Sequence, residues 1–75
     1  MKKTPKASLA QNFSANLKLK RAAAKLSQEA LAHKAGLSVS YISMLERGQR
    51  TPPLDTLEQI AKALGVPAVN LLRSA

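Results

Sequence analysis

Apolar residues recur at helical spacing along most of the chain, in short segments separated by serine, glycine and proline. Leu9, Phe13 and Leu17 follow one another at four-residue steps and predict one face of a helix over about 9–24, with Ser8 as its N-cap. No segment shows the alternating pattern of a strand. The pattern therefore predicts an all-α protein.

Serine and glycine mark the limits of two further short helices. Ser27 is the expected N-cap of a helix over about 28–35, and Ser38 that of a helix over about 39–47. Between them, Gly36 permits the left-handed backbone that a sharp turn requires. Two helices joined in this way predict a helix-turn-helix, which presents its second helix to a DNA major groove. The residues spaced to form its core are Leu31, Ala35, Leu37, Ile42 and Leu45.

Two more elements complete the expected fold. The prolines at 52–53 favour the start of a fourth helix over about 54–64, which Gly65 ends. Pro67 begins a last short helix, so that five helices are expected. The apolar face of the fourth helix consists of Leu54, Leu57, Ile60, Ala61 and Leu64.

The length of 75 residues allows one domain, expected over 8–75, after a basic arm over 1–7 that lacks apolar periodicity. The chain has no cysteine and one histidine, so we expect no disulfide, no Cys/His metal site and no cofactor. No apolar run approaches the ~20 residues of a membrane span, and no signal peptide is evident. A cytoplasmic location without membrane contact is the expectation.

Charge suggests the partner. Lys and Arg outnumber Asp and Glu by 12 to 4, which gives a net charge of +8 and an isoelectric point near 10.5. Eight of the basic residues lie within 1–35, where Glu29 is the only acid. Such a balance favours a polyanion, and double-stranded DNA is the expected partner.

Several blocks together carry a family resemblance. Residues 12–73 resemble the Cro/repressor-type (XRE-like) helix-turn-helix regulators of bacteria and phages, through Leu-Ser-Gln-Glu-Ala-Leu-Ala at 26–32, Gly-Leu-Ser at 36–38, Tyr-Ile-Ser-Met-Leu-Glu-Arg-Gly at 41–48 and the run at 57–66. The size is similar to that of restriction–modification controller proteins and phage Cro-like regulators. The resemblance implies five helices, binding to specific duplex DNA, and a homodimer on a palindromic operator.

The sequence departs from the family pattern at two places. Lys25 stands where family members often have glycine, and Pro53 stands where a capping serine is common. Both bear on local loop geometry.

The third helix is the expected recognition helix. If Ile42 points inward, the 100° step per residue puts Leu45 and Glu46 on the buried half and turns Arg47 outward. A serine hydroxyl can bond to base edges, and Met or Val can pack on a thymine methyl. The alternatives are simple solvation of the serines and an exposed or partner-facing position for Met44. The candidate base contacts are Val39, Ser40, Ser43 and Met44.

Phosphate contacts are expected on either side of that helix. Gln28 opens the second helix, where free N–H groups attract anions, and the resemblance assigns this position to the DNA backbone. The alternatives are a solvated basic loop after the third helix and a Tyr41 side chain packed under the second helix. The full set of candidates is Ser27, Gln28, Ser38, Tyr41, Arg47, Gln49 and Arg50.

Two structural roles are also expected. The resemblance implies an enclosed ion pair between Arg21 and Glu46, the alternative being that both side chains reach solvent. The C-terminal segment is too short to turn all its apolar residues inward, so a homodimer interface is expected at Val66, Val69, Leu71 and Leu72. Alternatively, Leu71 and Leu72 close the core of the monomer.

Two function classes remain. A transcriptional regulator, either a repressor or a controller protein, fits the resemblance and the charge. An antitoxin-type module that holds a toxin and represses its own operon is the alternative, although the short tails leave little extra sequence for a toxin. An enzyme is not expected, because no catalytic motif and no glycine-rich phosphate loop is present, and no small-molecule substrate is evident.

Overall fold

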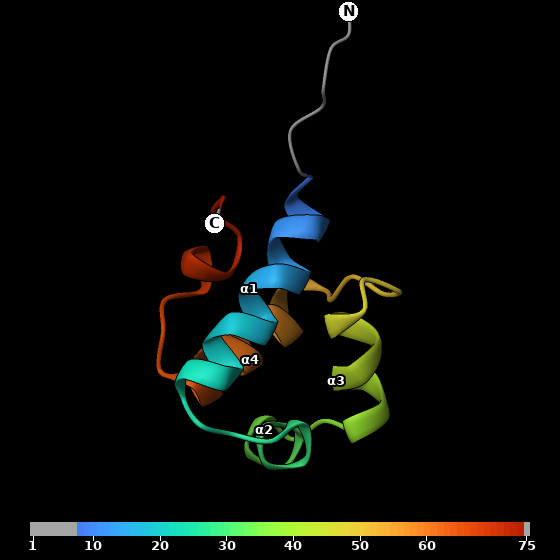
Figure 1. The fold of residues 1–75 in the computed structure, drawn as a ribbon, viewed down its shortest axis with the longest axis vertical. Coiled ribbons are helices and arrows are strands. Elements are labelled where there is room, and N and C mark those ends of the chain that lie inside the picture. The colour runs from blue at the N-terminus through green and yellow to red at the C-terminus, as the bar shows by residue number, and fades with distance from the viewer. Residues whose placement is uncertain (1–7, 75) are drawn as a thin grey trace, which may run out of the picture.

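The computed structural model describes residues 8–74, which form four α-helices and one short 3-10 helix, with no strand in this part of the chain (Figure 1). The elements are α1 (Leu9–Ala23), α2 (Gln28–Ala35), α3 (Val39–Glu46), α4 (Leu54–Leu64) and η1 (Ala68–Leu71). The all-α class is confirmed. The expected basic arm over 1–7 lies outside the described residues.

The expected count of five helices is not confirmed, because the structure has four α-helices and the last expected helix is a 3-10 helix. Residues 68–71 form a 3-10 helix, in which Asn70 N–H donates to the carbonyl of Pro67 and Leu72 N–H to that of Val69, both at 3.0 Å. An element of four residues is too short to build an α-helical ladder, so the tighter bonds between residues three apart replace it.

Side-chain caps fix where the first three helices begin. Ser8 and Gln11 form a capping box, since Ser8 Oγ accepts from Gln11 N–H at 3.1 Å and Gln11 Oε1 accepts from Ser8 N–H at 2.8 Å. Ser27 Oγ and Ser38 Oγ accept from the N–H three residues further on, at 2.9 and 3.1 Å. α4 begins after Pro53 without a side-chain cap.

All four α-helices end in the same way. A residue with positive φ follows each helix, and the next N–H bonds back to the carbonyl five residues earlier, as from Leu26 to Arg21 at 3.1 Å and from Leu37 to Ala32 at 2.8 Å. The four residues with positive φ are Lys25, Gly36, Gly48 and Gly65. The departure at Lys25 thus places a side chain in left-handed backbone that favours glycine.

Lys25→Gly is expected to raise the free energy of unfolding by about 1 kcal/mol, because the strain at φ 60° exceeds the extra entropy that glycine gives the unfolded chain. Urea denaturation and thermal melting measure this gain. Ala24→Gly is the matched control: Ala24 has φ −81°, so glycine there should lower stability. Equal effects of the two variants would contradict this explanation.

The helices enclose one aliphatic core with a single phenylalanine. α2 packs against α3 and α4, α1 packs against α3, and η1 packs against α1 and α4. In Figure 1, α2 is seen along its axis at the lower end of the molecule, and α3 lies to one side of α1 and α4, which cross each other. The fully buried large side chains are Phe13, Leu17, Leu31, Ile42, Leu45, Ile60 and Leu71.

Two residues expected on apolar helix faces are exposed. Leu9 is 64% and Leu54 77% exposed, although Phe13 and Leu57 on the same faces are buried. Each is the first residue of its helix, where the helix extends past the core. Both border a small apolar hollow of about 180 Å³, together with Leu72.

The segment after η1 is held against α1 by two asparagines one turn apart. Asn12 Nδ2 donates to the carbonyl of Leu72 at 3.1 Å, and buried Asn16 Nδ2 donates to that of Arg73 at 2.7 Å. Leu71 has no exposed surface and closes the core of the monomer. Its expected place in a dimer interface is therefore wrong, and the alternative holds for this residue.

Candidate nucleic-acid interface

α2 and α3 are joined by a three-residue turn at 36–38 that begins with Gly36. The glycine has φ 73° and ψ 31°, and, its two chain neighbours apart, no other residue comes within 4 Å of where its Cβ would be. Backbone conformation, and not crowding, therefore selects glycine here. The two helices share their buried residues Leu31, Ala32, Ala35, Ile42 and Leu45, while Leu37 packs against this core from its edge. The result is the expected helix-turn-helix.

The outer face of α3 is neutral and open. Val39 is 40% exposed, Ser40 is exposed, and Ser43 and Met44 are half-buried. Ile42, Leu45 and Glu46 are buried on the opposite side, as the helical step indicates. The four candidate base contacts thus lie along one accessible strip, which carries no charge of its own.

The structure joins Arg21 of α1 and Glu46 of α3 in a two-bond ion pair. Arg21 Nε lies 2.5 Å from Glu46 Oε2, and Arg21 Nη2 lies 3.1 Å from Oε1. A third guanidinium nitrogen, Nη1, donates to the carbonyl of Leu26 at 2.9 Å. The Glu46 side chain is 4% exposed, so the expected enclosed pair is present in this geometry.

Gln28 completes this network through a contact that was not predicted from the sequence. Its Nε2 donates to Glu46 Oε1 at 3.0 Å and leaves the Gln28 side chain half-buried. One amide proton is used on the carboxylate and one is left for a further acceptor. The contact holds the N-terminus of α2 against the C-terminus of α3.

These contacts set the pKa of Glu46. Burial raises the pKa of the carboxyl, but hydrogen bonds from Arg21 and Gln28 and the attraction of Arg21 and Lys18 outweigh it, so the pKa lies below its ordinary value. The bond to Glu46 likewise raises the pKa of Arg21. The pair is ionised at neutral pH.

The other candidate phosphate contacts lie at two places. Ser27 and Ser38 use an oxygen lone pair in capping, which leaves each hydroxyl proton to donate. Beyond α3, the guanidinium of Arg47 donates to Gln49 Oε1 from Nε at 3.3 Å and Nη2 at 3.1 Å, and Arg50 is exposed. Tyr41 is half-buried and packs against the core, which favours the packing alternative for its ring.

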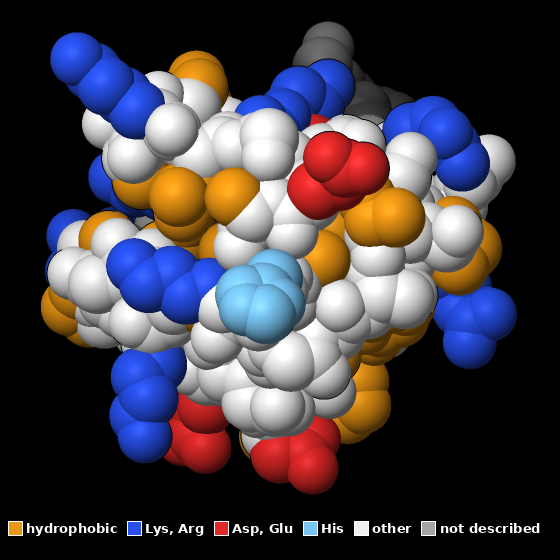
Figure 2. Space-filling view, turned by 90° about the horizontal axis from the view of Figure 1, so that it is seen from below, with side chains coloured by type: hydrophobic (Ala, Val, Ile, Leu, Met, Phe, Trp, Pro, Cys, Tyr) orange, Lys and Arg blue, Asp and Glu red, His pale blue; other side chains and the backbone are white. Residues whose placement is uncertain are grey.

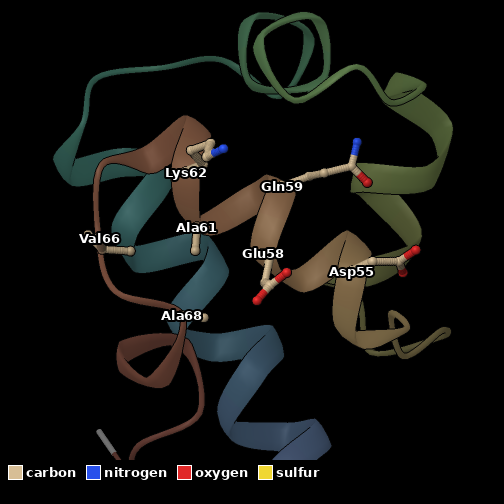
Figure 3. Close-up of a pocket in the computed structure, with 7 residues that line it drawn as sticks. All are labelled: Asp55, Glu58, Gln59, Ala61, Lys62, Val66 and Ala68. Atoms are coloured by element: carbon tan, nitrogen blue, oxygen red, sulfur yellow. The ribbon is translucent and has the colours of Figure 1, made fainter.

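Charge is unevenly spread over the surface. Figure 2 views the end that carries α2, and shows Lys and Arg side chains at its margins and beside the histidine, with acidic side chains near the upper centre and along the lower edge. A hollow of about 510 Å³ on α4 is lined by Asp55, Glu58 and Lys62, with Val66 and Ala68 from the following segment (Figure 3). Its two carboxylates make it a poor match for a polyanion. Residues 8–74 contain no group of three or more acidic or histidine side chains placed to hold a metal ion.

The fold and this surface define a helix-turn-helix protein. The sequence pattern of the Helix-turn-helix family (HTH_3) matches residues 17–71, and the chain belongs to this family. None of the helices in the described part of the chain has the length and apolar character needed to cross a membrane.

Solved structures and curated sequences agree with this assignment. The hypothetical transcription factor NHTF from Neisseria is similar at a TM-score of 0.86 and 35% identity, over 97% of this chain and 85% of that one. The restriction-modification controller protein C.AhdI from Aeromonas hydrophila has a TM-score of 0.78 and 40% identity, over 84% and 94%. Control protein C.BamHI from Bacillus amyloliquefaciens is 51% identical over 47 residues, which are 63% of this chain and 58% of that protein.

Coverage of the curated relatives is partial. The matched segment spans 61%, 58% and 37% of three of them. The chain therefore spans less than two thirds of the length of these relatives.

Proposed function

We propose that this chain is a transcriptional regulator that binds a specific site in double-stranded DNA through α3. The observation that carries the proposal is the uncharged, accessible strip of α3, with hydrogen-bond donors on one side of it and cations on the other. Gln28 and the cap of α2 lie on one side, and Arg47 and Arg50 on the other. Phosphate contacts of this kind position a helix, and contacts to base edges give specificity. The family membership and the relatives named as controller proteins support the same class.

We further propose that it binds as a homodimer to a palindromic operator. Two recognition helices must lie about 34 Å apart to enter successive major grooves on one side of the duplex. Val69 is 54% exposed, and Val66 and Leu72 are half-buried, so that apolar surface near the C-terminus is available for a two-fold contact. The dimer places both copies of α3 on one duplex.

Selection of bound duplexes from a random pool, with the purified protein, tests this function. Wild type should enrich one sequence with two-fold symmetry. Ser40→Ala or Met44→Ala should change the preference at individual base pairs by about 1 kcal/mol, because these side chains face the bases. Arg47→Ala should weaken binding to the selected duplex and to random duplexes by a similar factor, since a phosphate contact carries no direct sequence information.

Lys62→Ala is the control, because Lys62 lies on α4 beside the acidic hollow. It should leave both affinity and preference unchanged. The absence of any enriched sequence would overturn the proposed function. A change of preference caused by Arg47→Ala, with none from the variants on α3, would overturn the choice of surface.

A further inference from the structure

An open cleft of about 430 Å³ lies between α1 and the segment that follows α3. It is separate from the hollow on α4, which different residues line. The residues that decide its chemistry are Gln11, Ser14 and Lys18 from α1 and Arg47, Gly48 and Arg50 from the other wall. Lys18 was not among the contacts expected from the sequence.

The cleft is suited to an anion. Lys18, Arg47 and Arg50 give it three positive charges, and its one carboxylate, Glu46, is already paired with Arg21. The three cations come from two segments far apart in the sequence, which the fold brings around one space. Lys18 also contributes to the low pKa of Glu46, so its charge acts across the cleft.

The neutral side chains of the cleft add one donor. The Ser14 hydroxyl already donates to the carbonyl of Ala10 at 3.1 Å, and therefore offers only lone pairs. Gln11 accepts from Ser8 through Oε1, which leaves its amide N–H groups to donate. An anion in the cleft thus meets the three cations and the Gln11 amide.

The loop wall of the cleft and Arg47 are held in place before any ligand binds. Gly48 has φ 75°, and a Cβ there would lie 3.4 Å from Ser14 Oγ, so the loop approaches α1 closely. Gln49 holds the Arg47 guanidinium through two hydrogen bonds. A site whose groups are already positioned loses less entropy when it binds.

We infer that this cleft binds a backbone phosphate of the DNA duplex, with Lys18 as a further phosphate contact beyond the helix-turn-helix. The inference rests on the proposed function. Glu46 connects the two regions, because it lines the cleft and also accepts the hydrogen bond from Gln28. The phosphate contacts would then run from the N-terminus of α2, past the end of α3, to the middle of α1.

Lys18→Gln tests the inference in the full chain, because glutamine keeps the helix propensity and removes the charge. The probe is the duplex selected from the random pool, and its affinity is measured by fluorescence anisotropy over a range of salt concentrations. Loss of one phosphate contact should reduce the log–log salt slope by about 0.9 per bound protomer and the affinity about fivefold per protomer at 0.15 M salt. In ethylation interference, the variant should show one fewer phosphate per half-site at which ethylation blocks binding than wild type does.

Lys62→Gln makes the same charge change on α4 and should leave slope, affinity and interference pattern as in wild type. Lys18→Arg should keep the contact. If Lys18→Gln behaves like Lys62→Gln while wild type binds the selected duplex, the cleft does not hold a phosphate and the inference alone fails. If wild type selects no duplex, the proposed function itself fails.

Discussion

Glu46→Gln is expected to lower the free energy of unfolding by about 3 kcal/mol at pH 7, because it leaves the Arg21 guanidinium facing a neutral amide. The ionised carboxylate accepts two hydrogen bonds from Arg21 and one from Gln28 in an environment with little water. The total free energy of unfolding of a domain of this size is roughly 4–11 kcal/mol. The loss should therefore appear as a large shift of the midpoint in urea.

The effect should depend on pH with a defined sign. The pKa of Glu46 is lowered in the folded protein, so its contribution is fully present above the pKa of an unfolded glutamate, about 4.3. It is lost as the pH falls through the lower, folded pKa. The stability difference between wild type and Glu46→Gln should thus narrow below about pH 4.

Two further variants control this result. Glu58→Gln removes an exposed carboxylate on α4 and should change stability by less than about 0.5 kcal/mol. The double variant Arg21→Gln with Glu46→Gln should lose less than the sum of the two single changes, since the partners are coupled. A stability difference that stays constant down to pH 2 would contradict the ion-pair explanation.

The parts of the fold that local chemistry determines could be predicted from the sequence. Serine caps place the starts of α1, α2 and α3, and glycines place the ends of α2, α3 and α4, within one residue of the structure, because these signals involve residues only a few positions apart. The inward side of α3 follows from one angle per residue. For the same reason, the departure at Lys25 marked the one helix end with a strained side chain.

Contacts between distant segments were harder to predict. Gln28 and Glu46 are 18 positions apart, and periodicity on either helix does not show that one side chain will reach the other. Leu9 and Leu54 have the correct spacing but lie at the first turn of their helices, where no neighbouring element covers them. The cleft beside Lys18 depends on how the loop after α3 approaches α1, which only the folded chain determines.

Leu71 and Val69, which were both expected in one dimer interface, differ in burial. Leu71 is fully buried between α1 and α4, while Val69, two residues earlier, is 54% exposed. The 3-10 geometry of η1 turns the two side chains in different directions. A charged side chain at position 71 should therefore unfold the protein, whereas one at position 69 should prevent only the association of two protomers.

Val69→Asp is expected to stay folded and to weaken the proposed homodimer at least about 100-fold, because two-fold symmetry would bury two uncompensated carboxylates together. Leu71→Asp should unfold the chain, since it removes a fully buried leucine and buries a charge. Circular dichroism distinguishes these outcomes, and sedimentation equilibrium measures the mass, expected near twice 8.0 kDa for wild type at micromolar concentration. Leu54→Asp is the matched control, because Leu54 is 77% exposed and borders the apolar hollow; this variant should remain folded and dimeric. If Leu54→Asp dissociates the dimer and Val69→Asp does not, the interface lies at that hollow. If wild type stays monomeric even on its selected duplex, the proposed homodimer is wrong.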